Sequence, residues 1–294
     1  LVAGYDENGL RFGTQSLRQI LHQPAFVPEL PGVILRDAPR MPMRGLRMYL
    51  PGREDLTFFK RFLRDFASYF KYNTLILEMN AAMRLDRHPE LNAGWIEFGR
   101  SMNTTRRSRP AGPGGQFQDS THHDTGNFGV LEKDEVMDLV DYARSLGLDV
   151  IPEVPTLTHA YYLLTRHREF AEIQAAEWPD TYCPLIDEVY DLVFDVLEEI
   201  LEVMTPRTVH IGHDEWRMPM HVCENCRGRD YRDMFVQDVV RVHDFLADHG
   251  VRTAMWGDHL LESVRRDGAE GRSTKTATGY EFAKPGALSP QQVQ

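Results

Sequence analysis

The sequence contains few cysteines, an excess of acidic over basic residues, and no long apolar run. Three cysteines in 294 residues are too few for the disulfide framework of a small secreted domain. The net charge of -11 argues against nucleic acid as the main partner, because phosphate binding needs clustered Lys and Arg. No apolar run reaches the length of a membrane span, so we expect no membrane span.

Two of the cysteines leave a question about metal binding open. Cys223 and Cys226 have the spacing of half a zinc site, with His221 nearby, but the sequence holds no second pair to complete four ligands. A local disulfide or two reduced thiols is the simpler interpretation. We therefore expect no metal and no cofactor.

The first 40 residues differ from those that follow. The chain opens at Leu1 without an initiator Met or a signal segment, which indicates a piece of a longer protein. Residues 9–21 have helical spacing of apolar residues, and four prolines punctuate residues 24–39. We interpret residues 1–40 as the end of a preceding small domain with a linker, and residues 41–294 as the main domain.

From Arg44 onward, predicted strands alternate with predicted helices. Strands are expected at residues 45–50, 74–79, 148–153, 208–211 and 251–256, and helices at residues 57–72, 134–146, 187–203 and 235–249. This alternation predicts a parallel sheet covered by helices. In the first of these helices, apolar spacing places Phe59, Phe62, Leu63, Phe66 and Phe70 in the core.

Residues 81–129 interrupt this alternation with a long stretch rich in Gly, Pro, Arg and His. A segment of this length is too long for a simple connection in a compact domain. We interpret it as irregular, either a functional loop over a site or a partly disordered segment.

Two architectures fit the alternation, an open doubly wound sheet and a (β/α)8 barrel. No Gly-rich phosphate loop follows the first strand, so the doubly wound alternative lacks its nucleotide-binding fingerprint. Polar side chains at or beside the carboxyl ends of the strands favour the barrel, because a barrel gathers such residues around one mouth. They are Glu78, Glu153, His159, Asp214, Glu215, Trp256 and Asp258.

The adjacent carboxylates Asp214 and Glu215 are the strongest candidates for chemistry. An Asp-Glu dipeptide alone is usually a solvated pair. This one follows a β-branched run that ends at Ile211, and Gly212 allows a close backbone approach just before it.

The run from His210 to Glu215 resembles the His-x-Gly-Gly-Asp-Glu motif of glycoside hydrolase family 20, the β-N-acetylhexosaminidases. The likeness continues in Arg44-Gly45, in the Pro152-Glu153 segment with His159, and in Trp256-Gly257-Asp258. Residues 9–21 are similar to the end of the small α+β domain that precedes the barrel in that family. The resemblance covers most of residues 1–260.

The resemblance implies removal of terminal β-linked N-acetylhexosamine by substrate-assisted, retaining catalysis. Asp214 would orient the acetamido group of the substrate, and Glu215 would act as general acid and base. Arg44, His159, Trp256 and Asp258 would contact the sugar. A glycan substrate would be consistent with a periplasmic or secreted protein.

The sequence also departs from the family pattern. His213 stands where a second Gly is usual, and Leu77-Glu78-Met79-Asn80 replaces the His-x-Thr-Asp-Asp run of the second strand. Two alternatives therefore stay open: a catalytically lapsed barrel that binds glycans, and a glycosidase for another sugar. Residues 265–294 show at most a weak sixth strand near 276–280, so we expect the barrel to be incomplete, ending after about strand five or six.

Overall fold

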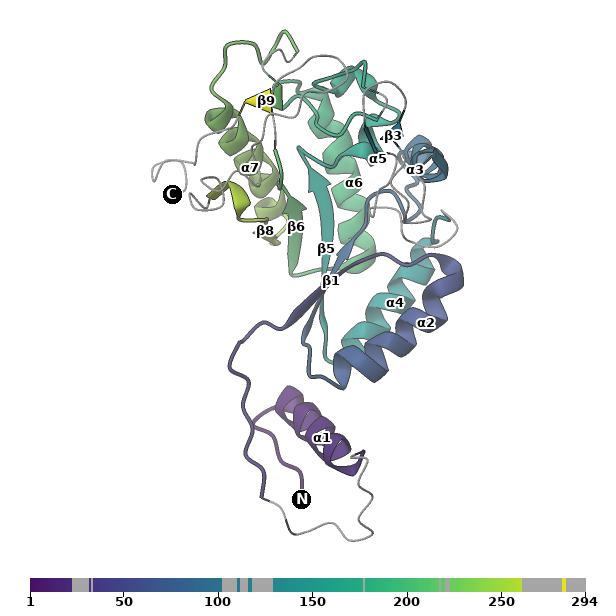
Figure 1. The fold of residues 1–294 in the computed structure, drawn as a ribbon, viewed down its shortest axis with the longest axis vertical. Coiled ribbons are helices and arrows are strands. Elements are labelled where there is room, and N and C mark those ends of the chain that lie inside the picture. Colours follow the sequence, from purple (N-terminus) through teal and green to yellow (C-terminus); the bar gives the residue numbers. More distant parts are fainter. Residues whose placement is uncertain are drawn as a thin grey trace.

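Five parallel strands form the centre of the protein (Figure 1). A computed structural model describes residues 1–22, 32, 34–101, 110–111, 116–117, 129–176, 178–216, 218–219, 223–260 and 282–283. The strands are β1 (Gly45–Tyr49), β2 (Thr74–Glu78), β5 (Asp149–Thr156), β6 (Thr208–Gly212) and β8 (Arg252–Ala254). All five predicted strands are confirmed, with ends shifted by up to three residues.

The order of strands in the sheet is the order in the chain, β1-β2-β5-β6-β8. A doubly wound sheet reverses its strand order at a switch point, whereas a barrel adds each new strand beside the last. The described residues therefore form five strands of a TIM-type (β/α)8 barrel, as the sequence predicts.

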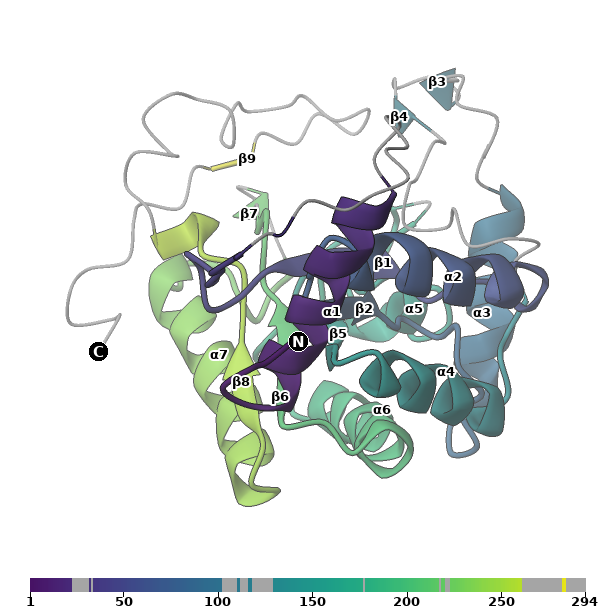
Figure 2. The ribbon, with the colours of Figure 1, turned by 90° about the horizontal axis from the view of Figure 1, so that it is seen from below.

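Helices cover the outer face of this curved sheet. Figure 2 shows α7, α6, α4 and α2 arranged in an arc outside the strands. Their bounds are α2 Leu56–Phe62, α4 Lys133–Ser145, α6 Glu188–Met204 and α7 Tyr231–Asp248. Within the described residues, no helix combines the length and hydrophobicity needed to cross a bilayer.

The other elements lie outside this set of strands and covering helices. Helix α1 (Glu7–Leu21) lies below the starts of the strands in Figure 1. The remaining elements are α3 Pro89–Ser101, α5 Tyr161–Leu164, the 3-10 turns η1 Arg53–Asp55, η5 Arg168–Phe170 and η6 Asp258–Leu260, and the strand pairs β3 Pro110–Ala111 with β4 Gln116–Phe117 and β7 Met218–Pro219 with β9 Phe282–Ala283.

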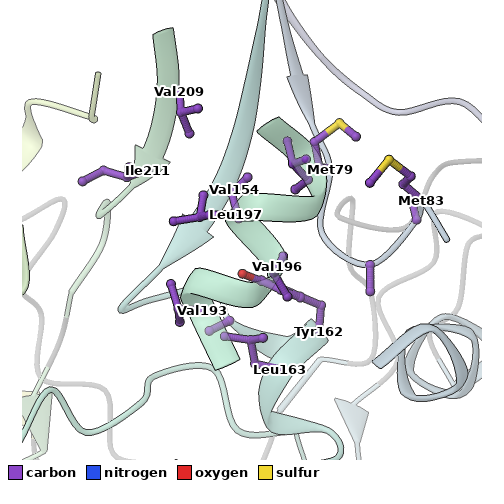
Figure 3. Packing of buried hydrophobic residues seen from close by; sticks show 14 of the residues in the cluster. Met79, Met83, Val154, Tyr162, Leu163, Val193, Val196, Leu197, Val209 and Ile211 are labelled. Atoms are coloured by element: carbon purple, nitrogen blue, oxygen red, sulfur yellow. The ribbon is translucent and has the colours of Figure 1, made fainter. Parts of the chain in front are cut away.

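The hydrophobic core lies between the sheet and its helices, and α6 contributes many of its residues. Figure 3 shows Val154 of β5 and Val209 of β6 facing a cluster that includes Val193, Val196 and Leu197 of α6. Helical spacing in this segment predicts a buried stripe, and all its members are buried: Val189, Leu192, Val193, Val196 and Ile200. Helix α6 ends where Thr205 takes a left-handed conformation, with φ of 40°.

The predicted core of the first long helix is only partly right. Phe59 and Leu63 are buried, but the relative exposures of Phe66 and Phe70 are 40% and 54%. Residues Leu63–Ser68 form a π-helical segment, η2, whose wider turn shifts the phase of every later side chain. Ala67 takes the buried position that helical spacing assigns to Phe66.

The predicted irregular stretch at residues 81–129 contains helix α3, so that interpretation is wrong for its first part. Leu91, Trp95 and Phe98 recur at helical spacing and are buried. The buried amide of Asn92 donates to the carbonyl oxygens of Ala81 and Met83, which fixes the helix against the end of β2. The weak strand expected near 276–280 lies outside the described residues.

The burial pattern of α4 gives a direct test of the fold. Leu139 is fully buried, whereas Met137 on the same helix is 48% exposed. We expect Leu139→Ala to lower the free energy of unfolding by about 2–5 kcal/mol, because it removes buried methyl groups and leaves a cavity. Met137→Ala should change it by less than about 1 kcal/mol. Urea denaturation measures both; equal losses would contradict the packing of α4.

Candidate active site

The strand register brings four polar side chains to the face of the sheet opposite the helices. Glu78 is the register partner of Glu153, and Glu153 is the partner of His210. Partners in adjacent parallel strands point to the same side, and side chains alternate along each strand. Arg47 lies two residues before Tyr49, the partner of Glu78, so it shares this face.

Arg47 joins the two buried carboxylates of this face. Its Nε donates to Glu153 Oε2 at 2.7 Å, and its Nη2 donates to Glu78 Oε2. The side chains of Glu78 and Glu153 are only 1% and 2% exposed. Burial raises the pKa of Glu153, and the guanidinium of Arg47 counteracts part of that effect. The amide of Asn80 donates to Glu78 Oε1 at 2.7 Å, which satisfies the other oxygen.

Glu153 also holds the indole of Trp256. Trp256 Nε1 donates to Glu153 Oε1 at 2.8 Å, and its ring centroid lies 4.6 Å from that of His210. Burial lowers the pKa of His210 to about 4, so this imidazole is neutral near neutral pH. This face of the sheet therefore carries one partly exposed cation, two buried carboxylates and two rings.

Asp214 and Glu215 lie directly beyond β6, with the ring of His159 beside both. His159 Nε2 is 3.5 Å from Asp214 Oδ2 and 3.6 Å from Glu215 Oε2. Burial opposes charge on His159, but its hydrogen bond with Asp214 and the charge of that carboxylate outweigh burial and raise the pKa of His159 to about 9. Burial also opposes charge on Asp214, yet His159 brings the pKa of Asp214 below its usual value. Near neutral pH, His159 is therefore an imidazolium and Asp214 beside it is a carboxylate.

The backbone around these residues is held in an uncommon conformation. His159, His213 and Glu215 have φ of 52°, 67° and 54°, in the left-handed region that residues with a Cβ rarely adopt. Gly212 has φ of 74°, and a Cβ there would lie 3.1 Å from Pro155 Cα. Strained residues gather at functional sites, where the surrounding structure compensates for the strain.

His213, the departure from the family motif, points into the core and away from the carboxylate pair. It is fully buried, and its Nε2 lies 3.3 Å from Oδ1 of the buried Asp238. Asp238 accepts hydrogen bonds from the hydroxyls of Tyr182 and Tyr190, at 2.9 and 3.0 Å. The other ring nitrogen lies 3.0 Å from the hydroxyl oxygen of Thr156. His213 therefore anchors the turn that presents Asp214 and Glu215.

The segment after β8 supports the same turn. Asp258 Oδ2 accepts a hydrogen bond from the backbone N–H of Glu215 at 3.0 Å. His259 Nε2 accepts from the backbone N–H of Trp216 at 2.8 Å. The structure thus gathers Asp214, Glu215, His159 and Asp258 at one site, with Trp256 on the adjoining interior face.

Arg44 is not part of this group. It precedes β1, so it lies at the amino ends of the parallel strands, whereas Asp214 follows the carboxyl end of β6. Its Nε donates to the carbonyl of Lys71, and its guanidinium stacks 4.9 Å from the ring of Phe12. There it lines a cavity of about 520 Å³ beside α1. Arg44 lies at the opposite end of the strands from Asp214, and this position corrects the prediction that Arg44 contacts the sugar.

Arg47 is the residue that sequence reasoning missed. The signal was present, because a lone Arg inside an otherwise apolar strand must have buried partners. Those partners come from β2 and β5, which lie 31 and 106 residues away in the chain. Among the described residues, the side chains close enough together to hold a metal ion are elsewhere, at Glu172 and the three cysteines.

The fold and the site define a barrel with a carboxylate pair at the carboxyl ends of its strands. The chain belongs to glycosyl hydrolase family 20, because residues 60–278 match the catalytic domain of that family. It is 28% identical over 244 residues to a β-hexosaminidase of Akkermansia muciniphila, covering 76% of this chain and 44% of that protein. A β-hexosaminidase of Porphyromonas gingivalis is 26% identical, with coverages of 89% and 34%.

Solved structures agree on the fold. The N-acetyl-β-hexosaminidase of Streptomyces plicatus is 24% identical with a TM-score of 0.61, covering 87% of this chain and 48% of that one. The β-N-acetylhexosaminidase of Bacteroides fragilis is 23% identical with a TM-score of 0.62, covering 87% and 49%. This chain spans less than half the length of these four relatives.

The buried carboxylates that pair with Arg47 predict a large effect of removing its charge. Arg47→Met leaves two buried carboxylates without their cation, and we expect it to lower the free energy of unfolding by about 3–5 kcal/mol. Arg53→Met is the matched control, because Arg53 pairs with Glu135 at the surface, and it should cost about 1 kcal/mol or less. Denaturant titration distinguishes the two. Similar losses would mean that the interior ion pair contributes no more than a surface one.

The raised pKa of His159 predicts how stability depends on pH. The folded protein holds this proton up to about pH 9, whereas the unfolded chain releases it near 6.5. The stabilisation is therefore complete below about 6.5 and is lost as the pH rises to about 9. We expect His159→Gln to reduce the fall in stability over this range. His243→Gln removes an exposed imidazole and should keep the wild-type slope; an unchanged slope in His159→Gln would contradict the ion pair.

Proposed function

We propose that the full-length protein to which this chain belongs removes terminal β-linked N-acetylhexosamine from glycans, with retention of configuration. The observation that carries this proposal is the position of Asp214 and Glu215, side by side beyond β6 with His159 3.5 and 3.6 Å from their carboxylate oxygens. The family relationship and the names of the hexosaminidase relatives support the choice of sugar.

Asp214 would act on the acetamido group of the substrate. The lowered pKa of Asp214 keeps it ionised, so it accepts a hydrogen bond from the acetamido N–H and turns the acetamido oxygen toward the anomeric carbon. That oxygen then forms the new bond to the anomeric carbon, so the protein itself needs no nucleophile. The positive charge that develops on the resulting ring is stabilised by the carboxylate.

Glu215 would move the proton in both steps. As the glycosidic bond breaks, Glu215 donates its proton to the leaving oxygen. In the second step Glu215 accepts a proton from water, whose oxygen attacks the anomeric carbon and restores the acetamido group. The side chain of Glu215 is 49% exposed, which leaves it reachable by both the leaving group and water.

His159, Asp258 and Trp256 each have a separate role in this proposal. His159 balances the charge of Asp214 and lies 3.6 Å from Glu215 Oε2. Asp258 holds the backbone of Glu215. Trp256, fixed by Glu153, offers an indole surface against which a sugar ring can pack.

Because the two carboxylates have different roles, we expect the loss of kcat to depend on the leaving group for a Glu215 variant but not for an Asp214 variant. We expect Glu215→Gln to lower kcat on N,N′-diacetylchitobiose by about 10²–10⁴-fold, because its alkoxide leaving group needs a proton. The loss on a nitrophenyl N-acetyl-β-glucosaminide should be smaller, because nitrophenolate leaves without one. Asp214→Asn should lower kcat on both substrates to a similar extent. Steady-state kinetics of the full-length protein measure these losses.

The matched control is Glu202→Gln, which changes an exposed carboxylate near the end of α6 and should keep wild-type kinetics. Equal hydrolysis of glucosides that lack the acetamido group would contradict substrate assistance and favour a glycosidase for another sugar. A full-length protein that binds N-acetylglucosamine but cleaves neither substrate would favour a lapsed, glycan-binding barrel.

A further inference from the structure

All three cysteines of the chain gather with one buried carboxylate in a group that the proposed mechanism does not use. Glu172, Cys183, Cys223 and Cys226 each offer one ligand atom, and these atoms lie within 4.8 Å of one another. Cys183 and Cys226 are fully buried, and Glu172 is 5% exposed. We refer to these four residues as the thiol cluster.

The cluster joins two segments that are far apart in the chain. Glu172 and Cys183 lie between β5 and α6, where an isolated bridge between Ala171 and Tyr182 makes their backbones neighbours. Backbone hydrogen bonds fix this arrangement, with Cys183 N–H donating to Phe170 O at 2.8 Å. The other two cysteines occupy a turn between β6 and α7. Each segment therefore supplies two of the four side chains.

The distances within the cluster suit a metal and do not suit a disulfide. Cys183 Sγ lies 3.3 Å from Cys226 Sγ and 3.4 Å from Cys223 Sγ, and all three thiols are free. A disulfide needs sulfur atoms about 2.05 Å apart. Sulfur ligands of a tetrahedral zinc ion, each roughly 2.3 Å from the metal, lie about 3.7 Å apart. Small side-chain movements would bring the thiols to that separation.

The electrostatic setting also favours a cation. Among the described residues, no Lys or Arg lies within ion-pair distance of Glu172. Its carboxylate instead accepts hydrogen bonds from Cys226 Sγ at 2.8 Å and from the backbone N–H of Cys223 at 3.3 Å. A buried carboxylate with only neutral donors is costly, whereas a divalent cation would stabilise it together with thiolates.

We propose that the thiol cluster binds one zinc ion, with Glu172, Cys183, Cys223 and Cys226 as its four ligands. Four protein ligands fill the tetrahedral coordination of zinc and leave no open position, so the site is structural. The Cys-x-x-Cys spacing of the turn matches the ligand spacing of such sites. The metal requires loss of the thiol protons, which couples its affinity to pH.

The thiol cluster joins the two segments that carry the residues of the candidate active site, so a bound metal would affect that site. One of the segments that it joins follows β5 and carries His159; the other follows β6 and carries Asp214 and Glu215. Zinc would fix these two segments to each other without contacting the substrate. This inference concerns the chain itself and does not depend on the proposed glycosidase activity.

The first test is the metal content of the full chain, purified without chelators. We expect about one zinc per chain by plasma mass spectrometry, and a decrease of about tenfold or more in Cys226→Ser. Glu172→Gln should also lower the zinc content. Glu224→Gln is the matched control, because Glu224 lies between the two cysteines of the turn, is exposed, and is not a ligand; it should keep the wild-type content.

Cobalt substitution tests the geometry without any variant. Co²⁺ added to the metal-free wild-type chain should give visible bands typical of tetrahedral cobalt and a thiolate charge-transfer band in the near ultraviolet. Zinc should abolish both. A metal-free purified chain that gives no such spectrum would overturn the proposal, as would a disulfide between two of these cysteines in non-reducing mass spectrometry.

Discussion

The ion pair between Arg47 and the carboxylates of Glu78 and Glu153 is the constraint on which the interior of this barrel depends. Three adjacent strands each contribute one member, so the charges are satisfied only when β1, β2 and β5 lie in their observed register. A slip of one residue would turn these charges toward the apolar core. The carboxylate of Glu153 also accepts a hydrogen bond from Trp256 Nε1, so the same group holds the segment after β8 in place.

The carboxylate pair lies one layer above this interior group and is positioned by loops. His213 anchors the turn through the contact of its ring with the hydroxyl of Thr156, and Asp258 holds it through the backbone N–H of Glu215. The strained conformations of His159, His213 and Glu215 persist because several independent contacts determine them. The geometry of the pair therefore depends on residues that would never contact a substrate.

The proposed zinc site would support the same loops. Loops after barrel strands carry function but have few contacts of their own, so a metal that joins two of them can replace a hydrophobic core. The thiol cluster would thereby hold together the segments after β5 and β6, which carry His159 and the pair Asp214 and Glu215.

The sequence by itself determined the alternation of strands and helices and the barrel class, because the hydrophobic period and the polar residues at strand ends follow directly from the order of residues. It also singled out Asp214 and Glu215 as candidates. It did not determine the phase of the helix after β1, since the π-helical turn at Leu63–Ser68 is an outcome of packing. Only the tertiary structure decided that Arg47, not Arg44, pairs with the buried carboxylates of β2 and β5. It also brought Glu172 and Cys183 to Cys223 and Cys226, because strand register and loop contacts join residues that sequence spacing keeps apart.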